Sequence, residues 1–84
     1  MTPFKNVKLT KSAAKELRPI PQKFRAAVQA ALDALAADPL LGTALLPPFE
    51  GCRRYRIGNY RIVYQFDATT LIVLSIRHRK DVYR

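Results

Sequence analysis

The chain has 84 residues, with 15 Lys or Arg against 6 Asp or Glu, and so carries a formal charge of +9 at pH 7. Because 49% of its residues are hydrophobic, the composition excludes a disordered basic tail, and the length predicts one small domain over residues 1–84. No apolar run reaches the ~18 residues of a membrane span, and the single cysteine, Cys52, excludes an internal disulfide. The sequence has no phosphate-binding glycine loop and no metal-ligand cluster, so we expect no cofactor, and the cysteine usage predicts a cytoplasmic protein.

The first half of the chain predicts one strand and two helices. Residues 4–9 alternate between two faces, which indicates a strand, and Thr10 is a good N-cap for a short helix over Lys11–Leu17. A break with two prolines at residues 19–21 separates this helix from a longer one that ends at Asp38. The longer helix is rich in alanine and has apolar residues at helical spacing: Phe24, Val28, Ala31, Leu32 and Leu35.

The second half predicts a loop and three strands. Residues 40–52 contain two glycines and two prolines and are typical of a loop. Strands are predicted at Arg53–Ile57, Tyr60–Phe66 and Leu71–Ile76, and the last is apolar on both faces, which indicates a covered central strand. The fold class is therefore α+β, with an N-terminal strand, a helical hairpin and three antiparallel strands. One face of the sheet would pack on the helices and the other would stay open.

Arginines alternate with apolar residues on both sides of a Gly58-Asn59 turn, the pattern of a hairpin. This hairpin would bring Arg54, Arg56 and Arg61 to one face, although like charges directly opposite each other destabilise a sheet. Residues 53–84 hold eight basic and two acidic residues, so we expect a polyanion partner, either nucleic acid or an acidic protein. The alternative is a solubilising charged face. The strand aromatics alternate opposite the arginines and are predicted to be core residues rather than base-stacking ones: Tyr55, Tyr60, Tyr64 and Phe66.

The register of the last two strands decides which residues join the arginines. A four-residue loop after Phe66 would place Ile76 opposite Arg61. His78 would then share the face of Arg61, whereas Arg77 would lie on the other face. A bulge or a frayed strand end would be needed to turn Arg77 back.

Three pieces of the chain resemble the RelE/ParE toxin superfamily: Arg54-x-Arg56 before a tight turn, YRIVYQ at residues 60–65, and HRKDVYR at residues 78–84. The resemblance covers the whole chain in length and element order, and residues 45–84 in detail. RelE-type members are ribosome-dependent endoribonucleases that cleave mRNA, whereas ParE-type members have the same fold and act on DNA gyrase. Both kinds are held inactive by an antitoxin, so the resemblance implies an acidic antitoxin as partner.

The resemblance also implies site residues. Metal-independent RNA cleavage needs a proton acceptor for the 2′-hydroxyl, cations for the charge on the transition state and a proton donor for the leaving 5′-oxygen. In RelE-type toxins these roles fall on two strand lysines, two arginines and a C-terminal tyrosine. The lysines correspond to Arg54 and Arg56, the arginines to Arg61 and Arg77, and the tyrosine to Tyr83.

The sequence departs from the RelE pattern at the two lysines. Arginine stays protonated in proteins, so Arg54 and Arg56 can bind phosphate but are poor proton acceptors. Histidine is the residue type that exchanges a proton near neutral pH, which makes His78 the first candidate for the base and Lys80 the second.

Three functions therefore remain open. The first is an mRNA-cleaving toxin of the RelE type. The second is a ParE-type inhibitor of gyrase, which the missing lysines favour and the set of Arg61, Arg77 and Tyr83 disfavours. The third is an inactive member that acts through antitoxin binding and repression of its own operon.

Overall fold

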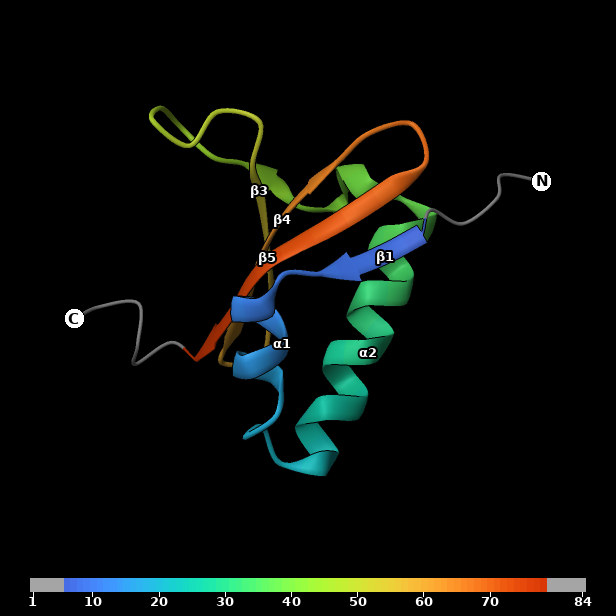
Figure 1. The fold of residues 1–84 in the computed structure, drawn as a ribbon, viewed down its shortest axis with the longest axis vertical. Coiled ribbons are helices and arrows are strands. Elements are labelled where there is room, and N and C mark those ends of the chain that lie inside the picture. Colours follow the sequence, from blue (N-terminus) through green and yellow to red (C-terminus); the bar gives the residue numbers. More distant parts are fainter. Residues whose placement is uncertain (1–5, 79–84) are drawn as a thin grey trace.

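Residues 6–78, which the computed structural model describes, form a five-stranded sheet and two α-helices (Figure 1). The strand order is β1-β5-β4-β3-β2, with β1 parallel to β5 and all other neighbours antiparallel. The elements are β1 (Asn6–Leu9), α1 (Lys11–Leu17), α2 (Gln22–Ala37), a 3-10 turn η1 (Pro39–Leu41), β2 (Thr43–Ala44), β3 (Arg53–Ile57), β4 (Tyr60–Phe66) and β5 (Thr70–His78). The predicted α+β class and element order are confirmed. The last strand, β5, is longer than the predicted Leu71–Ile76 and lies inside the sheet, between β1 and β4.

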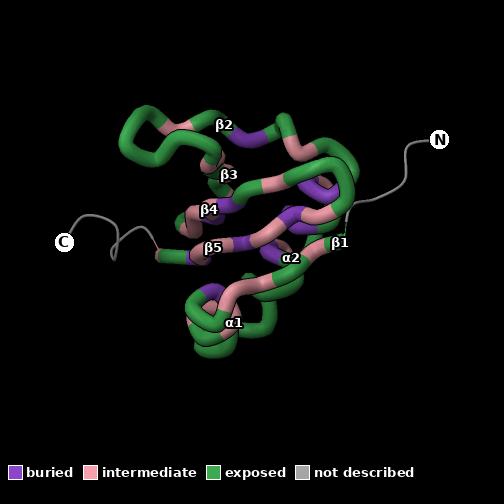
Figure 2. The backbone as a smooth tube through the Cα atoms, turned by 45° about the horizontal axis from the view of Figure 1, so that its top comes forward, coloured by how far each residue is buried: buried purple, intermediate pink, exposed green. Residues whose placement is uncertain are grey.

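The α2 helix covers one face of the sheet (Figure 2). Its alanine-rich sequence favours a helix, and its apolar stripe is buried against the side chains of β4 and β5: Val28, Ala31, Leu32 and Leu35 against Ile62, Tyr64, Leu71, Val73 and Ile76. Phe24 stands apart from this stripe, because it is 44% exposed and its ring contacts Tyr60. Neither helix of the described residues has the length and apolar character that crossing a membrane requires.

The α1 helix lies against β5, where it continues the line of β1 (Figure 2). The pairing of β1 with β5 ends at Leu9 and Val73, and the next residue, Thr10, begins the helix. The Thr10 hydroxyl accepts a hydrogen bond from the Ala13 N–H at 3.1 Å, which confirms the predicted N-cap. The helix therefore covers the part of the β5 edge that β1 leaves free.

β5 carries one residue more than β4, in a bulge. Tyr64 lies opposite Val73, but the preceding residue Val63 lies opposite Ser75, so Leu74 is the extra residue. The Thr10 hydroxyl donates a hydrogen bond to the Leu74 carbonyl oxygen at 3.1 Å. The start of α1 is thus tied to the bulge.

The bulge overturns the predicted register beyond this point. Arg61 lies opposite Arg77 instead of Ile76, and His78 lies opposite Tyr60. The expectation that His78 would share the face of Arg61 is therefore wrong, because one extra residue moves every later side chain to the other face.

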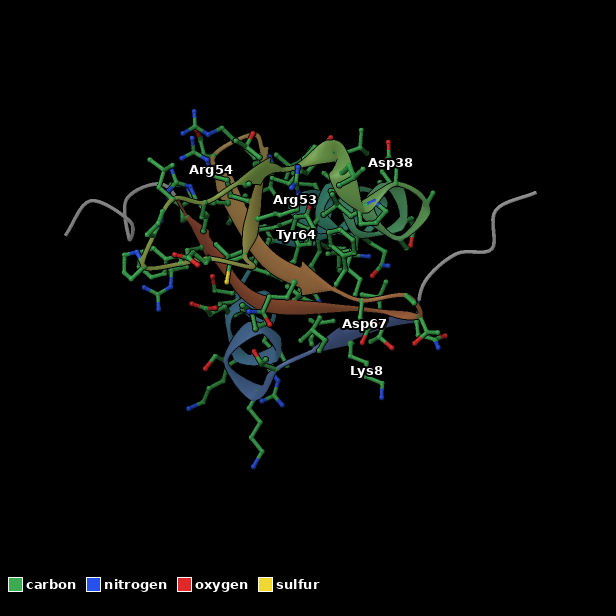
Figure 3. The ribbon with its side chains drawn as sticks, turned by 90° about the horizontal axis from the view of Figure 1, so that it is seen from above. Lys8, Asp38, Arg53, Arg54, Tyr64 and Asp67 are labelled. Carbon is green, nitrogen blue, oxygen red and sulfur yellow. The ribbon has the colours of Figure 1, made fainter. Side chains whose placement is uncertain are left out.

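The predicted loop after α2 contains η1 and β2, which the sequence did not reveal. The Tyr64 hydroxyl donates to the Pro39 carbonyl oxygen at 2.6 Å and accepts from the Gly42 N–H at 3.0 Å. The Arg53 guanidinium also donates to the Gly42 carbonyl oxygen, and Figure 3 shows Arg53 and Tyr64 close to this segment, with Arg54 pointing away from it. Two buried or half-buried side chains of the sheet therefore fix the path of the chain into β2.

Candidate functional site

Three arginines on neighbouring strands lie directly opposite one another. Arg56 of β3 pairs with Arg61 of β4, and Arg61 pairs with Arg77 of β5. We call these three the arginine row. Their side chains lie on the face opposite α2, because the residues beside them in each strand face the core. Arg54 shares this face two residues along β3, so the predicted grouping of Arg54, Arg56 and Arg61 is confirmed, and the bulge adds Arg77.

The row concentrates positive charge on an open surface. Neighbouring strands are about 4.8 Å apart, and like charges directly opposite each other destabilise a sheet by about 0.2–1 kcal/mol per pair. Among residues 6–78, the row forms one ion pair, between Arg77 and Glu16, which offsets part of this positive charge. The folded chain therefore holds cations together at a cost in stability, which favours the binding of an anion at this face.

A hollow of about 290 Å³ lies beside the row. It is lined by Leu41, Thr43, Arg54, Tyr55, Arg56 and Arg61. Arg61 is half-buried there, whereas Arg54 and Arg56 are exposed. The hollow thus combines guanidinium groups with the apolar side chain of Leu41 in η1 and the hydroxyl group of Thr43 in β2. A phosphate and its attached nucleoside would contact such a mixture of groups.

Glu16 of α1 holds the far end of the row. Its Oε2 accepts a hydrogen bond from Arg77 Nε at 3.0 Å, and its Oε1 accepts one from the Ile76 backbone N–H at 3.1 Å. One carboxylate thereby satisfies a donor on the free edge of β5 and fixes the neighbouring guanidinium.

The other predicted site residues are not part of this group. The His78 ring stands edge-on to Tyr60, with ring centroids 5.1 Å apart, and lines a separate hollow with Glu16 and Ile20 on the helical side. Tyr83 and Lys80 lie outside the described residues. No group of three or more His, Cys, Asp or Glu side chains that could hold a metal ion occurs in the part of the chain between residues 6 and 78.

The strand aromatics belong to the core, as predicted. Tyr64 is fully buried, and Tyr55, Tyr60 and Phe66 pack partly buried against the same cluster. None of these four rings is therefore free as a base-stacking platform.

Sequence reasoning missed Glu16, Leu41 and Thr43 as members of the site. Glu16 is 61 residues from Arg77 in the chain, and no local pattern links the two. Leu41 and Thr43 flank a glycine in a segment that reads as a loop, and a two-residue strand leaves no periodic signal.

Known toxins match the chain along nearly its whole length. The profile of the family described as the ParE toxin of the type II toxin-antitoxin system parDE matches residues 7–83. Toxin RelG of Mycobacterium tuberculosis (strain ATCC 25618 / H37Rv) is 35% identical over 82 residues, which cover 93% of this chain and 94% of the relative.

Solved structures of toxin–antitoxin complexes contain chains with the same fold. The toxin–antitoxin complex RelBE2 of Mycobacterium tuberculosis contains a chain that matches with a TM-score of 0.84 and 32% identity over 94% of each chain. The intact RelBE toxin–antitoxin complex of E. coli contains one with a TM-score of 0.75 and 22% identity, over 88% of this chain and 95% of that one. This chain therefore belongs to the RelE/ParE family and is a toxin of a type II toxin–antitoxin system.

Proposed function

We propose that this toxin cleaves mRNA on the ribosome and thereby stops translation. The observation that carries the proposal is the arginine row with Arg54 beside it, four arginines whose side chains leave the sheet on the face opposite α2. Guanidinium matches phosphate oxygens with two parallel hydrogen bonds, and four of them suit a backbone phosphate better than a single surface charge does. The likeness to RelG and to a RelBE2 chain at 32% identity supports the RelE branch of the family.

The chemistry proposed is an attack of the 2′-hydroxyl on the adjacent phosphorus. A bond forms between the 2′-oxygen and phosphorus while the 2′-proton leaves to an acceptor. The bond from phosphorus to the 5′-oxygen breaks, and that oxygen receives a proton. The products are a 2′,3′-cyclic phosphate and a 5′-hydroxyl. Arg61, half-buried at the centre of the row, would stabilise the added negative charge on the phosphate oxygens.

The proton acceptor must lie outside the four arginines, because arginine stays protonated. His78 lies on the helical side of the sheet, so we do not assign it the role of base. We assign the acceptor to residues 79–84, which include Lys80 and Tyr83, or to the ribosome itself. If the toxin supplies the cations and the ribosome supplies the proton acceptor, cleavage of mRNA would occur only on the ribosome.

The proposed partner is an acidic antitoxin encoded beside the toxin. A +9 chain with an arginine face would attract an acidic segment, and the related RelBE2 and RelBE proteins were solved as toxin–antitoxin complexes. Large apolar side chains are also exposed in the segment between α2 and β3: Leu40, Leu41, Leu46 and Phe49. Co-purification of the neighbouring gene product tests this, and recovery of the toxin alone from cells that express both genes would contradict it.

The main test is the integrity of mRNA after induced expression. We expect primer extension to detect new 5′ ends in translated mRNA, and purified toxin to cut mRNA only when ribosomes are present. Arg61→Ala should abolish the cuts while Arg18→Ala, an arginine exposed at the end of α1, should not. Intact mRNA in cells whose growth the wild-type protein has arrested would overturn the proposal.

A second candidate function is inhibition of DNA gyrase. Two observations favour it: the family profile that matches is that of a ParE toxin, and the arginine face lacks the lysines of the RelE pattern. In that case induced cells would show DNA damage signalling and filamentation with intact mRNA, and purified toxin would inhibit supercoiling by gyrase.

A further inference from the structure

The carboxylate of Glu16 joins a backbone group and a side chain of the same strand. Its Oε1 accepts from the Ile76 N–H at 3.1 Å and its Oε2 accepts from Arg77 Nε at 3.0 Å. The Glu16 side chain is 25% exposed and that of Arg77 is 55% exposed. Because the backbone bond holds one carboxylate oxygen in place, the position of the other oxygen, and of the guanidinium bonded to it, is fixed as well.

We propose that Glu16 is a positioning residue that holds Arg77 in the arginine row as a ligand for an RNA phosphate. This inference rests on the proposed function, in which the row binds the mRNA backbone. An unrestrained arginine loses much rotational freedom when it binds, whereas one already held by a partner loses less. Glu16 thus prepares the end of the row for binding.

The geometry leaves the binding edge of Arg77 available. Arginine has five N–H donors in a planar fork, and Glu16 uses the one on Nε. The four N–H groups on the two Nη atoms form no hydrogen bond with any other residue between 6 and 78. They present the edge that pairs with two phosphate oxygens at once.

Because Glu16 is negatively charged, the direction in which RNA affinity changes when it is replaced tests the proposal. A carboxylate beside the row lowers its positive potential, so removing that charge would by simple electrostatics tighten the binding of RNA. If Glu16 acts by orienting Arg77, removing it must instead weaken binding. The two effects have opposite signs, and the measured direction decides between them.

The test is a double-mutant cycle on RNA affinity with full-length toxin. The probe is a single-stranded RNA oligonucleotide with 2′-deoxy substitutions, which binds but cannot be cut. In Glu16→Gln, the amide oxygen can still accept from the Ile76 N–H, while its NH₂ group faces Arg77 Nε, a donor against a donor. We expect Glu16→Gln to weaken binding about tenfold, the size of one charge-assisted hydrogen bond, and not to weaken it further in an Arg77→Ala background.

Asp33→Asn is the matched control. Asp33 is exposed on α2 and bonds to Gln29, so this change removes the same charge far from the row and should not weaken binding. Unchanged or tighter binding by Glu16→Gln would overturn the inference. So would an equal loss with and without Arg77, which would mean that Glu16 supports only the fold.

The outcome also separates this inference from the proposed function. A wild-type toxin that binds the oligonucleotide but never cuts mRNA overturns the proposed cleavage and leaves the role of Glu16 to be decided by the cycle. A wild-type toxin that does not bind the oligonucleotide overturns the inference, whereas the proposed cleavage is then decided by whether the toxin cuts mRNA in the presence of ribosomes.

Discussion

Thr10 and Leu74 are 64 residues apart in the chain and are joined by a hydrogen bond of 3.1 Å from the threonine hydroxyl to the leucine carbonyl oxygen. The same hydroxyl accepts from the Ala13 N–H and begins α1. Leu74 is the extra residue that turns Arg77 toward Arg61. A helix cap and the geometry of the arginine row therefore depend on one oxygen atom.

The first prediction concerns this hydroxyl. Thr10→Ala removes the N-cap bond and the bond to the bulge, and should lower the free energy of unfolding by about 2 kcal/mol. Thr10→Ser keeps the hydroxyl and should lower it by much less. Urea denaturation measures both, and equal losses for Ala and Ser would show that the hydroxyl is not what matters.

The second prediction concerns the buried hydroxyl of Tyr64. Tyr64→Phe leaves the Pro39 carbonyl and the Gly42 N–H without their partner and should cost about 1–3 kcal/mol in unfolding free energy. Hydrogen exchange at the Gly42 amide should become faster than the loss of global stability explains. Tyr60→Phe is the control, because Tyr60 is only partly buried, and a similar effect there would contradict the prediction.

The third prediction concerns the close approach at Gly42. A Cβ atom at this position would overlap the Tyr64 hydroxyl and would lie 2.6 Å from the Arg54 carbonyl oxygen. Gly42→Ala should therefore destabilise the fold by about 1–3 kcal/mol, the usual cost of overpacking. Because both changes act on the same contact, the double variant with Tyr64→Phe should lose less stability in thermal unfolding than the sum of the two single losses. A Gly42→Ala protein as stable as the wild type would contradict the close packing at Gly42.

The fourth prediction separates stability from function in the row. Arg61→Met keeps a long apolar stem and removes the charge between Arg56 and Arg77, so the free energy of unfolding should rise by about 0.2–1 kcal/mol. RNA affinity and cleavage should fall in the same variant. The matched control, Arg18→Met at the C-terminal end of α1, should lower stability slightly because it removes a cation from that helix end. A less stable Arg61→Met protein would argue against repulsion in the row.

The fifth prediction concerns His78. Its ring lies against Tyr60 on the helical side of the sheet, so His78→Phe should retain mRNA cleavage. Loss of a general base costs about 100-fold or more in rate. A fall of that size in ribosome-dependent cleavage, with the fold intact by circular dichroism, would restore His78 as the base.

Local patterns were enough to predict most of the fold. The α1 helix follows from Thr10 and the break with two prolines after it, and the β3–β4 hairpin follows from alternation around Gly58-Asn59. Both depend on residues close together in the chain, where spacing alone carries the information.

The missing parts of the site depend on contacts between distant residues. The bulge at Leu74 is stabilised from Thr10, and the orientation of Arg77 from Glu16, both across more than half of the chain. Counting residues from the loop after Phe66 gives the wrong face for Arg77, because an alternating sequence pattern does not reveal where a bulge inserts one extra residue.

The shortness of β2 has a consequence for solubility. β2 pairs only with Arg53 and Arg54, so residues 55–57 of β3 form an exposed strand edge among the described residues. Such an edge invites pairing with another copy of the chain, and charged side chains discourage it. Arg54 and Arg56 therefore also protect the protein from aggregation, and variants that neutralise both should precipitate at concentrations where the wild type remains dispersed.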